Sequence, residues 1–509
     1  MDKLLSEGQF PPRWSGELNN GYGYPVFLFN YPLPALVGEV FHKTGLGYVD
    51  SVKAVLFVSM ILSVLGMYLF LKSFLGLRLA ALLGAIFYLY APLRFLNVYV
   101  AAAVGAALGG ALVPFVVWSM VKVTKSQKWV WVGALFFALL ILAHNVTALI
   151  FSSLILAFAG LLIWQSKDRW NLGKRLALMF ILGLGLSAWF WLPAILEKQY
   201  IRFNEVYAGF YKDQFVSLWQ LLRSPWGYGL SHPQNPEPGN MSYQLGLVQI
   251  AVMICWIPFL WAKRGIREIR VIGIFIVSFF LLSIFLMLKI SLPVWERLPF
   301  LSLVQFPLRF EALAILLASM AAALLVKYLP NRRLIFICLL VLVIYANRNH
   351  WNINQVFDPG ENYYLSLKTT TASYNEHLPK WGRVMPKEPS AKLEIIRGIG
   401  EIRVIQDQSA QVVAEIETTA SAKLRFNQFY FPGWQIQVDG KPVKFNYLTE
   451  GESYGLPVFD IDNGNHQILA EFKNTPIRNM ADGIGIVSVA IWLWLILLFR
   501  GAKRRGKLS

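Results

Sequence analysis

The sequence contains little cysteine, little histidine and little charge. Its 509 residues include two cysteines and six histidines, and only 15% are Asp, Glu, Lys or Arg. Cys255 and Cys338 both lie in apolar runs, which excludes a disulfide framework and a thiolate metal site. Because the histidines are scattered and no glycine-rich phosphate loop is present, a metal hydrolase, a kinase and a nucleotide-driven transporter are disfavoured. No metal ligand and no cofactor is indicated, and a requirement for a divalent metal stays open.

Apolar residues make up most of the chain. The hydrophobic set accounts for 56% of the residues and the mean hydropathy is +0.49, which excludes a disordered or an ordinary soluble protein. A helix needs about 20 apolar residues to cross a bilayer, and fewer where neighbours cover its ends. Eleven segments are candidate spans, although several are short and Leu334–Ala346 is the weakest of them: Val52–Leu71, Leu79–Leu93, Ala101–Val121, Trp129–His144, Thr147–Trp164, Leu176–Leu196, Ser242–Trp261, Val271–Leu288, Glu311–Val326, Leu334–Ala346 and Ile484–Phe499.

The formal net charge of +18 has a topological origin. If the spans alternate in direction, one set of connections holds 21 of the 47 lysines and arginines, but only two acids, Asp168 and Glu268. The rest of the chain is then close to neutral. The positive-inside rule places this set in the cytoplasm and the long loops outside, so we expect no nucleic-acid partner. The set consists of residues 72–78, 122–128, 165–175, 262–270, 327–333 and the tail 500–509.

These patterns predict a mainly α protein of the cell membrane. It is a polytopic helix bundle of about 11 spans with a C-terminal extracytoplasmic antiparallel β-sandwich domain, and its large loops lie outside while its C-terminal tail is cytoplasmic. We expect an external interfacial segment at 1–51, a transmembrane bundle at 52–346 with external loops 197–241 and 289–310, a β-rich domain at 347–483, and a final span with a basic tail at 484–509.

The expected β-domain is marked by alternating apolar and polar residues. This period of two occurs at 401–406, 412–417 and 423–429 and is typical of half-buried strands. Val438-Asp-Gly-Lys441 predicts a hairpin that pairs Trp434–Val438 with Lys441–Phe445.

The start of the chain does not fit the topology. Met1 is not followed by the charged region and apolar core of a signal peptide, although the charge argument places residues 1–51 outside. Either a short N-terminal tail is translocated, or a preceding span is missing because Met1 is an internal methionine. We favour the second alternative, because Met1–Phe10 reads like the middle of an amphipathic helix.

Pro11–Pro34 is rich in aromatic residues, glycine and proline, which suits a segment at the membrane interface. Two alternatives have equal weight. The segment is either an interfacial anchor or part of a substrate groove, with Glu17, Asn19, Asn20 and Tyr24 exposed.

Polar residues at the predicted outer ends of several spans are further site candidates. His144 and Asn145 form a polar pair between two spans, and such a pair is costly in a membrane unless it faces protein or water. The alternative is a helix cap. Arg94, Arg309 and Glu311 lie at the same predicted depth, and an arginine fork suits a phosphate or diphosphate.

Seven short motifs occur in an order that resembles the membrane proteins called 6-pyruvoyl-tetrahydropterin synthase-related, which are similar in turn to YfhO-type proteins and to the GT-C superfamily of polyprenyl-phosphate-sugar glycosyltransferases. The pterin synthase of that name is a soluble zinc enzyme with clustered histidines, which this chain lacks. The motifs are Gly8–Trp14 (GQFPPRW), Gly21–Pro25 (GYGYP), Tyr31–Leu33 (YPL), Leu142–Leu149 (LAHNVTAL), Trp189–Ala194 (WFWLPA), Gln305–Arg309 (QFPLR) and Phe429–Trp434 (FYFPGW).

The GT-C resemblance implies a first span, an acidic catalytic residue in the first external loop, and an outer groove for a lipid-phosphate sugar. This chain begins after the place of that span and acid. The implied activity is transfer of a hexose from a polyprenyl-phosphate donor to a cell-envelope glycan or lipid, with membrane lipid, the lipid-linked sugar and the envelope acceptor as partners.

For that reaction we predict a phosphate site and a carboxylate base. Arg309 and then Arg94 would bind the phosphate, His144 and Asn145 would position the substrate, and Glu17 or Glu311 would be the base. Asn20 and Tyr24 of the N-terminal groove would also contact the substrate.

Two other classes stay open. One is a non-catalytic or transport-related envelope protein that handles lipid-linked glycan, although the two similar halves of a transporter are not seen. The other is an inactive truncated product.

Overall fold

The computed structural model describes residues 1–353, 356–367, 374–382, 388–389, 391–448 and 455–505, with side chains as far as Phe499. The chain divides into two compact units. The β unit comprises Met1–Glu39, Ala188–Ala208 and Pro359–Gly485, and the helical unit comprises Val40–Ser187, Gly209–Asp358 and Ile486–Ser509. The N-terminal segment therefore belongs to the same unit as the C-terminal sheets.

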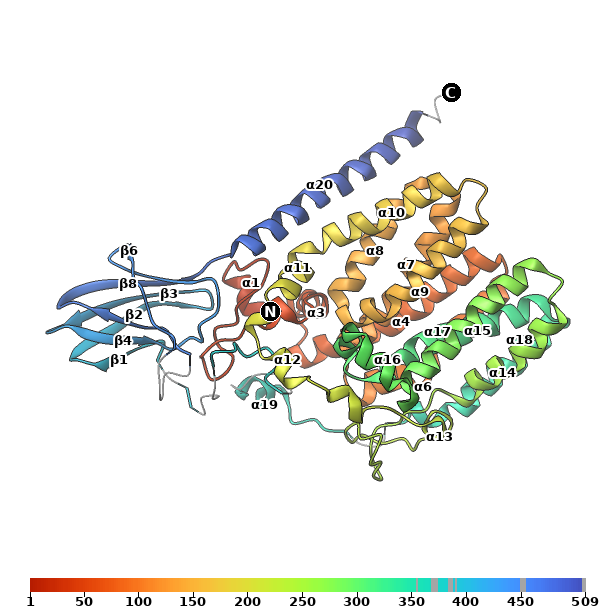
Figure 1. Cartoon of the computed structure of the whole chain (residues 1–509), viewed down its shortest axis with the longest axis horizontal. Coiled ribbons are helices and arrows are strands. Elements are labelled where there is room, and N and C mark those ends of the chain that lie inside the picture. Colours follow the sequence, from red (N-terminus) through yellow and green to blue (C-terminus); the bar gives the residue numbers. More distant parts are fainter. Residues whose placement is uncertain (354–355, 368–373, 383–387, 390, 449–454, 506–509) are drawn as a thin grey trace. The chain divides into compact units, whose positions relative to one another are not determined.

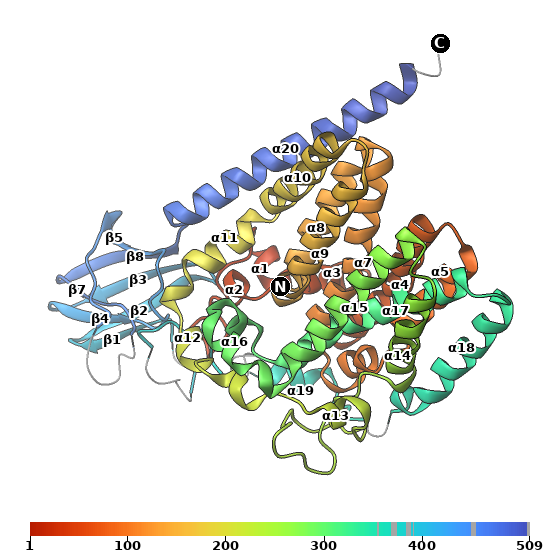
Figure 2. The same cartoon turned by 45° about the vertical axis from the view of Figure 1, so that its right-hand side comes forward.

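The helical unit contains most of the long helices in Figures 1 and 2. Its helices are α4 (Tyr48–Leu75), α5 (Arg78–Leu89), α6 (Pro92–Phe95), the π-helix η1 (Leu96–Val100), α7 (Val104–Lys125), η2 (Gln127–Trp129), α8 (Val130–Ala143), α9 (Asn145–Gln165), α10 (Arg169–Leu186), η4 (Phe210–Asp213), α13 (Leu218–Leu222), α14 (Leu247–Ala262), α15 (Arg267–Met287), η5 (Lys289–Ser291), α16 (Leu292–Arg297), η6 (Pro299–Val304), η7 (Pro307–Phe310), α17 (Glu311–Tyr328), α18 (Arg332–Ala346) and η8 (Arg348–Trp351).

Two helices form the centre of the helical unit. The apolar window of α7 is 83% buried and that of η7 with α17 is 89% buried, whereas that of α15 is only 39% buried. Helix α7 is rich in alanine and glycine and α17 is rich in alanine, and small side chains let neighbouring helices approach closely. The unit is thus built around two small-residue helices.

Six described helices are long and apolar enough to cross a membrane, or up to eight if each of two bent pairs counts as one span. Each of the eleven predicted segments overlaps a helix. However, α8, α14 and α18 have only 14, 16 and 15 residues, which is short of the roughly 20 residues that a crossing needs. The count of eleven is therefore not confirmed.

The β unit has two antiparallel sheets (Figure 1). The order is β1-β4-β7 in the first and β2-β3-β8-β5-β6 in the second. Both contribute side chains to one hydrophobic core, while their arrangement as a sandwich stays a prediction. The strands are β1 (Leu393–Arg397), β2 (Gly400–Gln408), β3 (Gln411–Thr418), β4 (Ala422–Phe426), β5 (Trp434–Val438), β6 (Lys441–Pro442), β7 (Val458–Ile461) and β8 (Gly464–Phe472).

The predicted hairpin is confirmed, with a shorter second strand. Val438 pairs with Lys441, and both turn residues, Asp439 and Gly440, have positive φ angles of 51° and 76°. This is the backbone conformation that an Asp-Gly hairpin turn requires. Strand β6 ends at Pro442, whose nitrogen cannot donate to the ladder.

Helical elements of the β unit are short. They are α1 (Asp2–Ser6), α2 (Val26–Phe29), α11 (Ala188–Leu196), η3 (Lys198–Tyr200), α12 (Phe203–Val206) and α19 (Glu361–Ser366), while α3 (Leu33–Lys43) and α20 (Pro476–Arg505) each begin in this unit and end in the helical unit.

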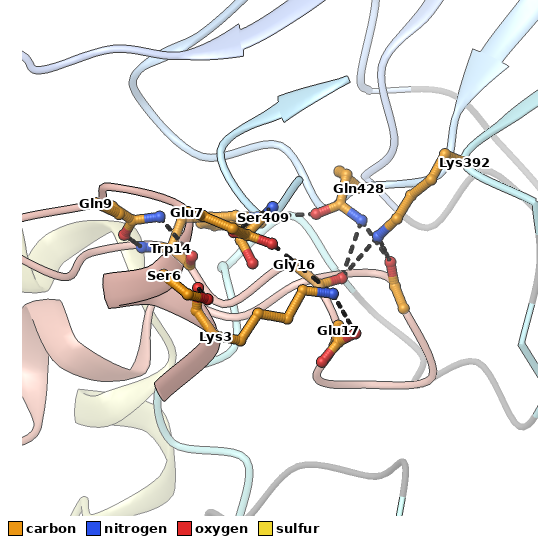
Figure 3. Close-up of polar contacts among 11 residues, drawn as sticks. Lys3, Ser6, Glu7, Gln9, Trp14, Gly16, Glu17, Lys392, Ser409 and Gln428 are labelled. Atoms are coloured by element: carbon orange, nitrogen blue, oxygen red, sulfur yellow. Dashed lines mark hydrogen bonds and ion pairs between the residues drawn. The ribbon is translucent and has the colours of Figure 1, made fainter. Parts of the chain in front are cut away.

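The N-terminal segment packs into the core of the β unit instead of forming a separate interfacial element. Trp14 is fully buried, its indole packs edge-on against Trp434 at 5.6 Å, and its Nε1 donates to Oε1 of Gln428 at 2.8 Å. Lys392 donates to the carbonyl oxygens of Gly16 and Gly21 at 2.7 and 2.8 Å (Figure 3). These contacts join residues that are 371 to 420 positions apart in the sequence.

A buried ion pair connects other segments of the β unit. Arg478, at the start of α20, donates from Nε to Oε2 of Glu197 at 2.9 Å, and its Nη2 lies 2.9 Å from the same oxygen. The two side chains are 0% and 1% exposed. Thr475 donates to the other oxygen of Glu197 at 2.6 Å, and Arg478 also donates to the carbonyl of Pro432 at 2.8 Å. Burial on this scale is tolerated only when both charges are fully paired.

Replacing Glu197 by alanine should destabilise the β unit by about 3–5 kcal/mol, because it leaves the guanidinium of Arg478 buried without its carboxylate. Chemical unfolding of the purified full-length protein in detergent, followed by tryptophan fluorescence, measures this. Lys423→Ala is the control, since it removes a solvent-exposed pair with Asp460 and should leave the midpoint unchanged. An unchanged midpoint for Glu197→Ala would contradict the role of the pair.

Acid should also destabilise the β unit. Burial lowers the pKa of His377 from 6.5 to about 4, and its Nδ1 has no hydrogen-bond partner among the described residues. The neutral imidazole is thus favoured in the folded state. Its contribution is complete above pH 6.5 and is lost as the pH falls to 4, with a magnitude on the order of 3 kcal/mol. Unfolding midpoints measured between pH 7 and 4 should fall less steeply for His377→Gln, and parallel curves would refute the assignment.

Candidate functional site

Arg94 is a charged side chain in the interior of the helical unit. It lies on α6, directly after a 54° bend between α5 and the α6–η1 segment, and it is 6% exposed. Its Nη2 donates to the carbonyl oxygen of Gly110 at 3.0 Å, and its guanidinium carbon lies 4.0 Å from the ring centroid of Tyr88. No carboxylate pairs with Arg94 among the described residues. A buried cation without a counter-ion is costly and marks a candidate anion site.

Two adjacent glycines of α7 make room for this site. A Cβ atom on Gly110 would lie 2.5 Å from Nη1 of Arg94, and one on Gly109 would lie 3.0 Å from Cβ of His144. Arg94 and His144 therefore pack against neighbouring positions of the same helix. Larger residues at either position would separate them from α7.

His144 is the N-cap of α9. Its Nδ1 accepts from the backbone N–H of Thr147 at 3.0 Å and lies 2.7 Å from the Thr147 hydroxyl. Because a backbone N–H can only donate, Nδ1 carries no proton, and the neutral ring bears its proton on Nε2. The helix-cap alternative is thus what the structure shows for this residue. Asn145, the next residue, is exposed, and its Oδ1 accepts from the N–H of Val146.

Arg309 lies beside a strained turn. Gln305 has φ 65° and ψ −50°, and the N–H of Phe306 donates to the carbonyl of Val304 at 2.7 Å, which is the geometry of the rare classic γ-turn. Nη1 of Arg309 donates to the same carbonyl at 2.8 Å and to Oε1 of Gln305 at 3.0 Å. Strain of this kind persists only where surrounding contacts hold it, often at functional sites.

Helix α9, which begins directly after His144, contacts η6 and η7, and Arg309 belongs to η7. The structure therefore brings Arg94, His144 and Arg309 to one region around α7 and α9.

Glu311 begins α17, two residues after Arg309. It is 1% exposed, and its Oε1 has no hydrogen-bond partner among the described residues. A helix N-terminus favours a carboxylate, but a buried carboxylate oxygen without a partner is still unfavourable. Glu311 is the candidate for contact with a substrate or proton donor.

The N-terminal candidates belong to the β unit and differ from expectation. Asn19, Asn20 and Tyr24 are 0%, 8% and 0% exposed, so the prediction that they are exposed is wrong. Tyr24 fills the core, and its hydroxyl accepts from the backbone N–H of His377 at 2.9 Å. Glu17 is exposed and forms an ion pair with Lys3 (Figure 3). Of these four residues, only Glu17 can meet a substrate without rearrangement.

Sequence reasoning missed two polar groups of the helical unit. Tyr88 supports Arg94 with its ring and donates to the carbonyl of Gly110 at 2.7 Å. Gln249 of α14 is fully buried, and its Oε1 has no partner among the described residues. A glutamine within an apolar helix is a signal that the sequence already contained. The pairing of Tyr88 with Arg94 was not readable, because it depends on the bend.

Among the described residues, no group of three His, Cys, Asp or Glu side chains could hold a metal ion. The site therefore consists of cations, one buried carboxylate and neutral polar groups.

Comparison with known proteins identifies a family. A family model described as "6-pyruvoyl-tetrahydropterin synthase related domain; membrane protein" matches residues 29–354, which is more than half of the chain. No curated protein and no solved structure matches the chain. The matched range contains Arg94, His144, Asn145, Arg309 and Glu311, but not Glu17, Asn20 or Tyr24.

Gly110→Ala should destabilise the helical unit by about 1–3 kcal/mol, because the new methyl group forces the buried guanidinium of Arg94 off its carbonyl and ring contacts. Gly160→Ala is the matched control, since Gly160 has open space around its Cβ position. Thermal unfolding in detergent measures both. Equal melting temperatures for the two variants would show that Arg94 is not held against α7.

Proposed function

Because the chain belongs to the 6-pyruvoyl-tetrahydropterin synthase related family of membrane proteins, we propose that its helical unit binds a lipid-linked phosphate and transfers a sugar from it. The donor is a polyprenyl-phosphate hexose, and the acceptor is a hydroxyl of an envelope glycan or lipid. The observation that carries the proposal is the buried guanidinium of Arg94 without a carboxylate partner among the described residues.

Phosphate binding is the first step of the proposed reaction. Arg94 presents its planar fork from a position that Gly110 and Tyr88 hold rigidly. Arg309 is oriented by Val304 and Gln305. Two arginines on separate elements can share the oxygens of one phosphate, and their charge stabilises the phosphate as it leaves.

The proposed transfer step inverts the anomeric carbon. The acceptor oxygen forms a bond to C1 of the sugar as the bond from C1 to the phosphate oxygen breaks, and polyprenyl phosphate leaves with the electron pair. The acceptor proton passes to a carboxylate base. Glu311 is the better candidate, because it belongs to the same compact unit as Arg94 and Arg309, whereas Glu17 is already paired with Lys3.

The proposed topology follows from charge. The connections with the lysine and arginine excess, together with the C-terminal tail, lie in the cytoplasm, and the β unit lies outside. Arg94, His144 and Arg309 then lie at the outer ends of their helices, where a lipid-linked donor and an external acceptor can meet. We also propose that the chain has about eleven spans and that the two sheets form a sandwich.

A second candidate is a non-catalytic protein that handles lipid-linked glycan. The observation that favours it is the cap at His144, whose Nδ1 is engaged by Thr147 and therefore serves the helix and not a substrate. Binding of polyprenyl phosphate without turnover would support this alternative.

Arg94→Ala and Arg309→Ala should each lower sugar transfer by about 100-fold or more, as expected for loss of a group that stabilises the leaving charge. The assay uses the reconstituted full-length protein and a radiolabelled polyprenyl-phosphate hexose. Arg297→Ala is the matched control, since Arg297 is an exposed arginine of the same unit. Wild-type transfer rates in Arg94→Ala and Arg309→Ala would refute the proposed phosphate site.

A further inference from the structure

A groove opens in the helical unit between the C-terminal part of α14, the end of α17 and the first half of α18. These three helices lie side by side in both views (Figures 1 and 2). The groove has a volume of about 600 Å³, within the roughly 300–1,000 Å³ typical of ligand pockets. Phe259 and Leu325, both buried, are part of its lining, and so is Leu334, which is 59% exposed.

The groove is far from the candidate phosphate site. Leu325 lies fourteen residues along α17 from Glu311, which corresponds to about 21 Å at 1.5 Å per residue. The two features therefore occupy opposite ends of the same central helix. A ligand in the groove would not contact Arg309 or Glu311.

Charge on the groove is of one sign. Its lining consists of apolar and cysteine side chains with a single charged residue, Lys263, directly after the end of α14. The side chain of Lys263 has no ion pair or hydrogen bond within the part of the chain that the structure describes. Further cations flank the groove, Arg264 after α14 and Arg332 and Arg333 at the start of α18. The only acid in 262–270 or 327–333 is Glu268.

We propose that this groove binds one anionic glycerophospholipid, with its acyl chains along α14, α17 and α18 and its phosphate at Lys263. The apolar lining of the groove suits the acyl chains, because the groove opens beside exposed apolar residues such as Leu334 and Ile337 that would face lipid. The unpaired lysine and its basic surroundings explain the preference for an anionic headgroup. Basic pockets between membrane helices recognise lipid headgroups in this way.

Two cysteine thiols can report whether this groove is occupied. Cys255 and Cys338 are the chain's only cysteines, both are free and exposed, and both line the groove. A bound lipid would cover the two thiols. Their modification by a small maleimide therefore reports occupancy in the unaltered full-length protein.

The test compares the protein in vesicles of phosphatidylcholine with the protein in vesicles that also contain phosphatidylglycerol. N-ethylmaleimide modification of Cys255 and Cys338 is followed by mass spectrometry. Phosphatidylglycerol should slow modification of the wild-type protein about tenfold when the lipid is present at about ten times its dissociation constant. Lys263→Gln should abolish most of this protection, and Lys263→Arg should retain it.

Comparing variants within one vesicle composition removes the effect of lipid surface charge on thiol reactivity, because all variants are exposed to the same surface potential and local pH. Lys128→Gln is the matched control, since it removes an exposed lysine from another basic connection and should leave protection unchanged. Equal modification rates in the two kinds of vesicle would overturn the proposal. Protection that persists in Lys263→Gln would overturn the assignment of the phosphate to Lys263. Loss of sugar transfer has no bearing on either result.

Discussion

Charged side chains in an apolar interior need compensating contacts, and this requirement shapes both units. In the helical unit, the guanidinium of Arg94 is tolerated because Gly110 offers a carbonyl at 3.0 Å and Tyr88 offers a ring face. In the β unit, Arg478 is tolerated because it donates to the carboxylate of Glu197 and to the carbonyl of Pro432. The hydroxyl of Thr475 donates to the other oxygen of that carboxylate. The two arginines differ in how they are paired. One is fully paired within the chain, and the other has no carboxylate partner among the described residues.

The packing of the N-terminal segment changes the view of the candidate site. An aromatic, glycine-rich and proline-rich segment suggested a membrane interface or a substrate groove, but Trp14 and Tyr24 fill the core of the β unit. Gly23 shows why this composition is needed. Its φ is +84°, and a Cβ atom there would lie 2.4 Å from the indole of Trp14, so only glycine lets the chain turn against that ring. The segment's composition reflects packing against the sheets.

Helix α17 links the two features of functional interest in the helical unit. Its first residues follow the strained turn at Gln305 and carry the buried Glu311. Its last residues form one wall of the apolar groove. The two cysteines of the groove lie on α14 and α18. The small side chains between them allow close packing of α5, α14 and α15 around the helix. A single helix therefore carries the buried Glu311 at one end and part of the apolar groove at the other.

The sequence by itself determined the apolar helices, the alternating strands and the Asp-Gly hairpin, because each follows from local periodicity or turn chemistry. It also singled out Arg94, His144, Arg309 and Glu311, since ionisable or polar residues within apolar runs are conspicuous. Tertiary structure decided how these residues are used. The cap at His144 depends on the chain direction after α8, and the burial of Tyr24 depends on sheets formed more than 350 residues later. The support that Tyr88 and Gly110 give to Arg94 depends on a bend and on a neighbouring helix. The local sequence shows which polar residues lie in apolar segments, but only long-range packing specifies which of them have hydrogen-bond partners.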